Sequence, residues 1–218
     1  MTTTATTMVG LRQTTVVVLA KDPVPGRVKT RLQSRFSPAQ AAELARAAID
    51  DTFTAVRAAG PARVLAAWAG TGTDAVPADV EVTAQVDGGL DRRIEAALEH
   101  AFVGADGPVL LVGMDTPQLT ATDLDVDWRS TDAVLGLTPD GGYWVIGLRS
   151  FVPGCVQGVP MSTEHTGRAQ LDRLRSLGLR VTRLGELDDV DTPTDAALLA
   201  QRSPHLRFAT AYRSMVSS

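Results

Sequence analysis

The sequence predicts an α/β fold, a three-layer sandwich around a mixed but mainly parallel sheet. Two observations predict it: short apolar runs rich in β-branched residues, and longer stretches of helical periodicity that alternate with them. Strands that alternate with helices need crossover connections, which make neighbouring strands parallel and place helices on both faces. No internal repeat or long linker interrupts the pattern, so we expect one domain over residues 14–203, between a disordered tail (1–13) and a C-terminal tail (204–218).

The first half of the chain contains three expected strands and two expected helices. The β-branched run at 14–20 is typical of a strand buried on both faces. A helix begins after Ser37, which forms a capping box with Gln40, and it ends at the pair Gly60-Pro61. Two further strands and an amphipathic helix follow, at 62–69, 80–85 and 89–104.

The second half continues the alternation. A strand and loop at 108–119 precede two strands around a turn at 131–148. A helix at 162–178 and a strand at 179–187 come next. A late helix has its start signal in Thr192, Pro193 and Asp195.

The composition argues against several classes of function. The 218 residues carry 21 Lys and Arg against 25 Asp and Glu, and a net charge of −4 disfavours nucleic acid or an anionic membrane as the main partner. The single cysteine, Cys155, excludes an internal disulfide and suits a reducing compartment. The apolar runs are too short to span a bilayer, and the Thr-rich start lacks the apolar core of a signal peptide. We therefore expect a cytoplasmic protein, with its oligomeric state left open.

Charged residues follow four of the expected strands, at the point where each strand ends. In open α/β sheets, ligands bind beyond the carboxyl ends of the strands. The first strand is followed by a basic loop that contains Lys21, Arg27, Lys29 and Arg31. Three other strands are followed by acidic residues: Asp115, Asp140 and the group Asp188, Asp189 and Asp191.

This division of charge predicts a site for a metal ion and a polyphosphate. Carboxylates from separate loops repel one another unless a cation lies among them. Magnesium suits such a position, because it takes oxygen ligands and shares them with substrate phosphates. Lys and Arg bind polyphosphate, and Gly26 allows a close approach of the backbone. The glycine patterns of Walker A and dinucleotide-binding loops are both absent from the sequence.

Each of these segments also has a purely structural interpretation. Asp115 could cap a turn, and Asp140-Gly-Gly is a natural hairpin signal. Asp191 could stabilise a helix start, while Lys29 and Arg31 could form an ordinary solvated face. The functional interpretation depends on position, because all four segments follow strands at the same expected edge of the sheet.

Four motifs resemble those of a bacterial family in the nucleotide-diphospho-sugar transferase (GT-A) superfamily, whose members are commonly labelled glycosyltransferases. They occur in the family's order and spacing over residues 16–201, as AKDPVPGRVKTRL, GMDTPQL, PDGGYWVIGL and DDVDTPTD. The chain is also similar to molybdenum-cofactor and 2-phospholactate guanylyltransferases, which carry an Asp-x-Pro after the central strand and an Asn- or Asp-Thr-Pro near the end. The resemblance implies the GT-A fold, which is Rossmann-like.

The resemblance also implies roles for individual residues. Asp115 and Asp191 would hold Mg²⁺ (or Mn²⁺), and the catalytic residues would be these two with Lys29 and Arg31. The nucleotide would contact the basic loop at Ala20, Lys21, Gly26, Arg27, Lys29 and Arg31. The small-molecule acceptor would contact Asp140, Gly141, Gly142 and Tyr143, with both glycines offering backbone N–H groups. Of the neighbours Tyr143 and Trp144, we expect one in the core and the other in the acceptor pocket.

Three functions remain open at this point. In the first, an NMP passes from an NTP to a small phosphorylated or acidic acceptor, and pyrophosphate leaves. The second is a GT-A glycosyltransferase that uses an NDP-sugar, and the third is a non-catalytic nucleotide-binding protein. The four basic side chains of the first loop are more than an NDP leaving group requires when a metal ion already stabilises it. Pyrophosphate carries more negative charge, so nucleotidyl transfer is favoured. We expect Gln85 and residues 86–95, with Asp91 and Arg92, to flank the nucleotide or the acceptor.

Overall fold

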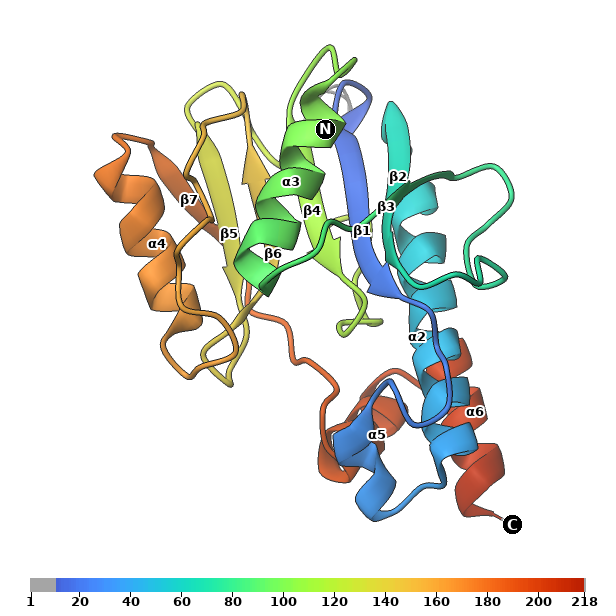
Figure 1. The fold of residues 1–218 in the computed structure, drawn as a ribbon. Coiled ribbons are helices and arrows are strands. Elements are labelled where there is room, and N and C mark those ends of the chain that lie inside the picture. The colour runs from blue at the N-terminus through green and yellow to red at the C-terminus, as the bar shows by residue number, and fades with distance from the viewer. Residues whose placement is uncertain (1–10, 218) are drawn as a thin grey trace, which may run out of the picture.

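The computed structural model describes residues 11–217, and its centre is one sheet ordered β3-β2-β1-β4-β6-β5-β7 (Figure 1). Strand β6 runs antiparallel to both of its neighbours, and all other neighbouring strands are parallel. The predicted mixed, mainly parallel sheet is therefore confirmed. The strands are β1 (Thr15–Lys21), β2 (Arg63–Ala69), β3 (Glu81–Ala84), β4 (Val109–Gly113), β5 (Ala133–Leu137), β6 (Tyr143–Leu148) and β7 (Val181–Leu184).

The order of the strands reverses at β1. The chain passes outward from β1 to β2 and β3, and then returns to place β4 on the other side of β1. In the register, Val17 of β1 lies between Leu65 of β2 and Leu111 of β4. A reversal of this kind opens a crevice at the carboxyl ends of the strands, because the two connections leave in opposite directions.

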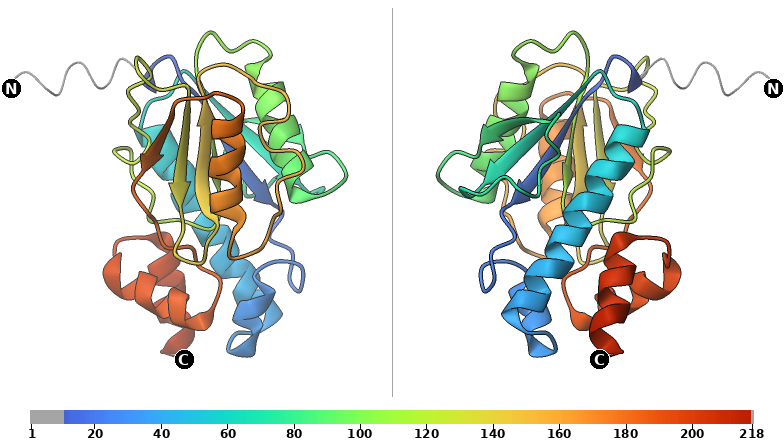
Figure 2. Two further views of the ribbon diagram at one scale, coloured as in Figure 1. Left: turned by 90° about the vertical axis from the view of Figure 1, so that its left-hand side faces the viewer. Right: turned by 90° about the vertical axis from the view of Figure 1, so that its right-hand side faces the viewer.

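Helices cover both faces of the sheet and complete the three layers (Figure 2). Alternate β1 side chains point to opposite faces. Val16 and Val18 belong to the core cluster shared with helix α2 (Pro38–Ala58). Val17 belongs instead to the cluster that includes helices α3 (Leu90–Phe102) and α4 (Thr166–Ser176).

The predicted helix starts are confirmed by side-chain contacts. Ser37 and Gln40 form both hydrogen bonds of a capping box at the start of α2. Thr192 and Asp195 form a second capping box at the start of helix α5 (Pro193–Arg202). Each box satisfies backbone N–H groups that have no partner within the helix.

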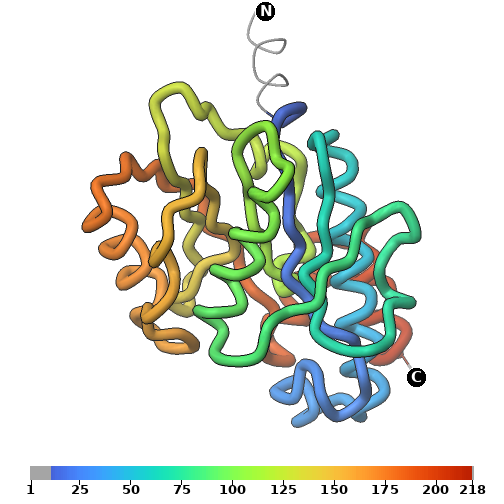
Figure 3. The backbone as a smooth tube through the Cα atoms, turned by 45° about the horizontal axis from the view of Figure 1, so that its top comes forward, coloured from blue at the N-terminus to red at the C-terminus, as the bar shows by residue number. Residues whose placement is uncertain are grey.

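The C-terminal residues differ from the tail expected at 204–218, because Arg207–Val216 form helix α6. Helix α6 packs beside α2, which extends beyond the sheet edge (Figure 3). Phe208 is fully buried there, and its backbone N–H donates to Asp51 Oδ2 at 2.9 Å. The apolar residues of α6 are therefore buried against α2, a contact that forms only in the folded chain. Of the expected N-terminal tail, Leu11 is buried, and residues 1–10 lie outside the described range.

Two smaller expectations concern the cysteine and the membrane. Cys155 is a buried free thiol, and burial raises its pKa to about 12, as for a packing residue rather than a nucleophile. Within residues 11–217, no helix combines the length and apolar character needed to cross a membrane.

Candidate functional site

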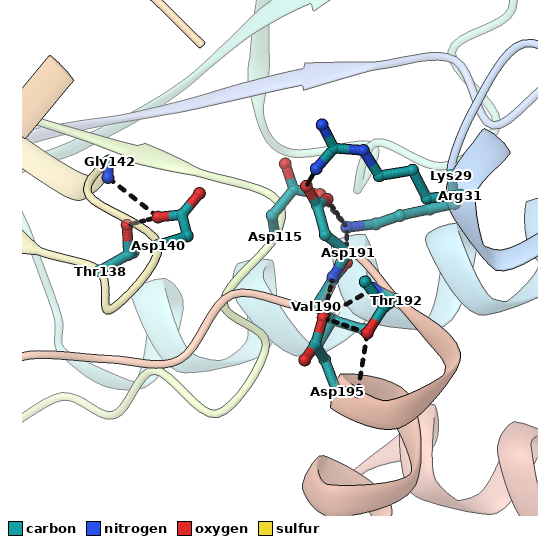
Figure 4. A network of polar contacts seen from close by, with 10 residues as sticks. All are labelled: Lys29, Arg31, Asp115, Thr138, Asp140, Gly142, Val190, Asp191, Thr192 and Asp195. Carbon is teal, nitrogen blue, oxygen red and sulfur yellow. Dashed lines mark hydrogen bonds and ion pairs between the residues drawn. The ribbon is translucent and has the colours of Figure 1, made fainter. Parts of the chain in front are cut away.

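The sheet gathers the charged loops at one edge. Strands β1, β4, β5 and β7 all end there, and the antiparallel β6 begins there. The basic loop after β1 leads into a short 3-10 helix, η1 (Thr30–Ser34), which contacts α5 below the sheet (Figure 1). The loops carrying Asp115, Asp140 and Asp191 therefore reach the same region as Lys29 and Arg31 (Figure 4).

Lys29 joins three of these loops through one ammonium group. Its Nζ forms an ion pair with Asp115 Oδ1, donates to the backbone oxygen of Val190 and lies 3.8 Å from Asp191 Oδ1 (Figure 4). Only 4% of the Lys29 side chain is exposed, against 49% for Asp115 and 38% for Asp191. The buried ammonium thus holds together two carboxylates that stay open to solvent.

Two further contacts fix the same loops. Arg31 Nη1 donates to Asp191 Oδ2 at 2.9 Å, although 73% of the Arg31 side chain is exposed. The backbone N–H of Val190 donates to the carbonyl oxygen of Asp115 at 2.9 Å. Asp115 and Asp191 therefore lie on loops bonded to each other directly as well as through Lys29.

Backbone strain is concentrated beside this cluster. Among residues 11–217, Lys29 (φ +46°) and Ser162 (φ +59°) are the two non-glycine residues with left-handed backbone, and both line the same cavity. Side chains disfavour this conformation, and such strain is common at functional sites.

Two adjoining cavities open at the edge. The basic cavity, of about 530 Å³, has Ala20, Lys21, Lys29, Arg31, Gln85 and Arg93 in its lining, together with Asp115 and Asp191. The acidic cavity, of about 490 Å³, combines carboxylates with apolar residues; its lining includes Asp115, Asp140, Asp189, Asp191, Tyr143 and Met161. The charged residues Arg31, Asp115 and Asp191 line both cavities, so they lie where the two meet.

Not every predicted nucleotide contact reaches these cavities. Gly26 and Arg27 are exposed and line neither of them, and Gly26 serves a turn at φ +80°. Gln85, which we expect to flank the nucleotide or the acceptor, lines the basic cavity, and its Nε2 donates to the carbonyl oxygen of Ala20 at 2.9 Å. In helix α3, Leu90 and Arg93 line the basic cavity, whereas the sequence interpretation singled out the neighbouring arginine, Arg92, within the segment 86–95.

The backbone N–H groups of Gly141 and Gly142, to which the resemblance assigns acceptor binding, form hydrogen bonds within the protein. The N–H of Gly141 donates to Thr138 O at 3.1 Å, and that of Gly142 donates to Asp140 Oδ1 at 2.9 Å. Both groups are used inside the β5–β6 turn. Gly141 is needed for packing, because a Cβ there would lie 2.0 Å from Glu164 O.

The two aromatic residues both line the acidic cavity but differ in burial. Trp144 is 3% exposed, and its Nε1 donates to Gly185 O at 2.9 Å. Tyr143 is partly exposed to the acidic cavity, and its hydroxyl lies 3.9 Å from Met161 Sδ. Burial raises the pKa of the Tyr143 hydroxyl, so this group stays protonated at neutral pH.

Asp189 is a site residue that the sequence interpretation did not select. It lines the acidic cavity, and its pKa is raised to about 6 by burial, and further by the negative charges of Asp140 and Asp191. The repeated acid in DDVD was the available signal, but which carboxylate faces the cavity depends on how the loop bends.

The donor set at the edge fits a divalent cation of the magnesium type. Asp115 and Asp191 already converge on one positive charge, and Asp115 Oδ2 accepts no hydrogen bond within residues 11–217. Those residues contain no complete cluster of three His, Cys, Asp or Glu ligands. Magnesium is commonly held by one or two carboxylates, with the remaining positions filled by water and substrate phosphates.

The site can be compared with known proteins. The family model described as "Uncharacterized protein conserved in bacteria (DUF2064)" matches residues 40–163, more than half of the chain. The 3-phospho-D-glycerate guanylyltransferase of Phenylobacterium zucineum (strain HLK1) is 31% identical over 186 residues, which cover 79% of this chain and 84% of that protein.

Solved structures share the fold. A protein of Desulfovibrio desulfuricans G20, assigned to the nucleotide-diphospho-sugar transferases, superposes with a TM-score of 0.85 at 24% identity and covers 94% of this chain and 96% of its own. CMP:2-keto-3-deoxy-manno-octonic acid synthetase in complex with CTP gives 0.54 at 16% identity, over 87% of this chain and 99% of its own. The expected resemblance is confirmed: the chain belongs to the bacterial DUF2064 family, has the nucleotide-diphospho-sugar transferase (GT-A) fold and is a transferase.

Proposed function

We propose that this transferase is a metal-dependent nucleotidyltransferase, which joins an NMP from an NTP to a small phosphorylated acid and releases pyrophosphate. The 31% identical relative is a guanylyltransferase named for 3-phospho-D-glycerate, so GTP and phosphorylated three-carbon acids are the first substrates to test. The observation that carries the proposal is the junction of a basic cavity with an acidic one at Lys29, Arg31, Asp115 and Asp191.

The charges of the two cavities suit the two halves of the reaction. A triphosphate is strongly anionic, and the basic cavity offers cations from β1, the loop that follows it and α3. A divalent cation bound by Asp115 and Asp191 would neutralise negative charge on the reacting phosphates. The acidic cavity holds the acceptor, and Arg31 provides a positive charge at its boundary.

In the proposed reaction an acceptor oxygen attacks the α-phosphorus of the NTP. The new P–O bond forms as the bond from the α-phosphorus to the β-phosphate bridging oxygen breaks, and pyrophosphate leaves with that oxygen. No protein nucleophile is needed, so the chain's residues act by positioning the reactants and by stabilising charge. Arg31 suits this role because it is exposed at the junction and held toward Asp191.

The proposal is tested by incubating the protein with GTP, ATP, CTP or UTP, Mg²⁺ or Mn²⁺, and 3-phospho-D-glycerate or related acids. We expect pyrophosphate release that requires both the acceptor and the metal, together with a product whose mass equals acceptor plus NMP minus water. The Asp115→Asn variant is the matched control, since it removes one carboxylate charge at nearly constant size.

Two results would overturn the proposal. One is that no NTP yields pyrophosphate under any of these conditions. The other is that NDP is released from an NDP-sugar, which would indicate glycosyl transfer. Pro117 stands where glycosyltransferases of this fold carry the second acid of Asp-x-Asp, which disfavours that outcome.

A further inference from the structure

We infer that Arg93 binds the phosphates of the nucleotide and that it shares this task with Lys21. The inference deepens the proposed function and rests on it. Arg93 lies in the first turn of α3, Lys21 is the last residue of β1, and both line the basic cavity.

The cations of the basic cavity fall into two groups. Lys29 is paired with Asp115, and Arg31 is paired with Asp191, so much of their positive charge is already neutralised. Within residues 11–217, neither Lys21 nor Arg93 has a carboxylate within 4.0 Å. The unneutralised charge of the cavity therefore lies at Lys21 and Arg93, and that charge attracts an anion most strongly.

The guanidinium of Arg93 is oriented before any ligand binds. Its Nε donates to the carbonyl oxygen of Gly88 at 2.9 Å, whereas Nη1 and Nη2 have no partner within residues 11–217. An arginine fixed by one edge presents its two remaining nitrogens as a fork, which matches two oxygens of a phosphate group. Gly88 has a φ of +123°, which glycine adopts readily.

This arrangement divides the site by charge. All four cations line the basic cavity: Lys29 and Arg31 lie beside the carboxylates that suit a metal, whereas Lys21 and Arg93 have no carboxylate partner within residues 11–217 and are left for the rest of the triphosphate. Arg93 would therefore contact the phosphates that leave as pyrophosphate, rather than the reacting α-phosphate beside the metal.

The test compares Arg93→Gln with Arg92→Gln, its exposed neighbour that lines neither cavity. Binding of inorganic tripolyphosphate, GTP and GMP is measured by titration calorimetry. A charged hydrogen bond of typical strength corresponds to a loss of about tenfold or more, so Arg93→Gln should weaken tripolyphosphate and GTP binding by at least that factor. GMP binding should fall less than about threefold, and Arg92→Gln should match the unaltered protein.

The outcomes separate this inference from the proposed function. Unchanged tripolyphosphate binding by a folded Arg93→Gln protein, or no binding by the unaltered protein, would overturn the role of Arg93. An equal loss for GMP and GTP would also overturn it, since the contact would then involve the base or the ribose. Arg93-dependent tripolyphosphate binding without turnover of any NTP would support the phosphate site and count against nucleotidyl transfer.

Discussion

Lys29 shows how one residue decides the geometry of this site. A side chain from the loop after β1 reaches Asp115 after β4 and Val190 after β7, so its ammonium group connects three segments far apart in the sequence. The sequence interpretation assigned Lys29 to phosphate binding. In the structure the Lys29 side chain is 4% exposed and its ammonium is paired with Asp115 within the protein.

Replacing Lys29 with Met should destabilise the protein in the absence of metal. The change leaves Asp115 and Asp191 close together without their shared counter-charge, and we expect a loss of about 2 kcal/mol in the free energy of unfolding. Added Mn²⁺ should restore part of the loss, because a divalent cation supplies the missing charge. Thermal unfolding with and without Mn²⁺ measures both effects; no response to Mn²⁺ would argue against a metal at these carboxylates. Arg12→Met, at an exposed residue outside both cavities, is the control.

The raised pKa of Asp189 predicts how the free energy of unfolding depends on pH. Its folded-state pKa of about 6 lies above the ordinary value of 3.8, so between these values the folded protein binds more protons than the unfolded chain. Stability from this group therefore falls as the pH rises through that window. Without divalent metal, Asp189→Asn should stabilise the protein by about 1 kcal/mol near pH 7.5, allowing for solvent screening, and should change little near pH 4. Urea unfolding at both pH values tests this, with exposed Asp106→Asn as control.

At the scale of elements, the β5–β6 turn and the start of α4 form one packed unit. The N–H of Gly167 in α4 donates to Gly141 O at 2.8 Å, and Asp140 closes the turn by accepting from Gly142. The residues expected to bind the acceptor therefore shape the wall of the acidic cavity. Both hydrogen bonds to the Asp140 side chain go to Oδ1. The other carboxylate oxygen, Oδ2, has no hydrogen-bond partner within residues 11–217.

Alanine substitutions at two glycines with positive φ separate packing from backbone strain. Gly141 (φ +91°) would place its new Cβ 2.0 Å from Glu164 O, whereas Gly26 (φ +80°) has nothing within 4 Å of that position. Gly26→Ala should cost about 1 kcal/mol from backbone strain alone. Gly141→Ala should cost several times more and reduce turnover, because α4 must move. Chemical unfolding and activity assays measure this; equal losses at both positions would contradict the packing argument.

At the scale of the whole molecule, α2 connects two bodies of apolar packing. One face of α2 covers the sheet, and the part beyond the sheet edge packs with η1, α5 and α6 (Figure 1). The loop containing Lys29 and the loop containing Asp191 both enter this second body, where Leu32 and Val190 are buried. The C-terminal helices thus support the site from below, and Asp195 of α5 accepts a hydrogen bond from the backbone N–H of Asp191 at 3.2 Å.

Phe208→Ala tests this support. Removing a fully buried phenylalanine should lower the free energy of unfolding by about 3–5 kcal/mol. If the second body holds the site loops, nucleotide affinity should also fall at temperatures where the protein remains folded. Val216→Ala, at a residue that is 42% exposed in the same helix, should change neither quantity. A Phe208→Ala protein of unchanged stability would contradict the packing seen for α6.

The sequence by itself determined the alternation of strands and helices, the capping box of α2, the start signal of α5 and the loops that carry opposite charges. These features depend on local periodicity, on hydrogen bonds between residues three apart and on the residues that follow each strand. It also supplied the resemblance through motifs that now lie along one edge of the sheet.

Only the tertiary structure decided which side chains share a contact. Helix α6 could not be predicted from its own residues, because Phe208 is stabilised by contacts with α2, where its partner Asp51 lies more than 150 residues earlier in the chain. The bending of separate loops against one another decides three features of the site. Arg93 rather than Arg92 lines the basic cavity, Asp189 lines the acidic cavity, and the Lys29 ammonium is buried. Distance, burial and charge pairing across such loops are properties of the folded chain, and no local pattern of residues encodes them.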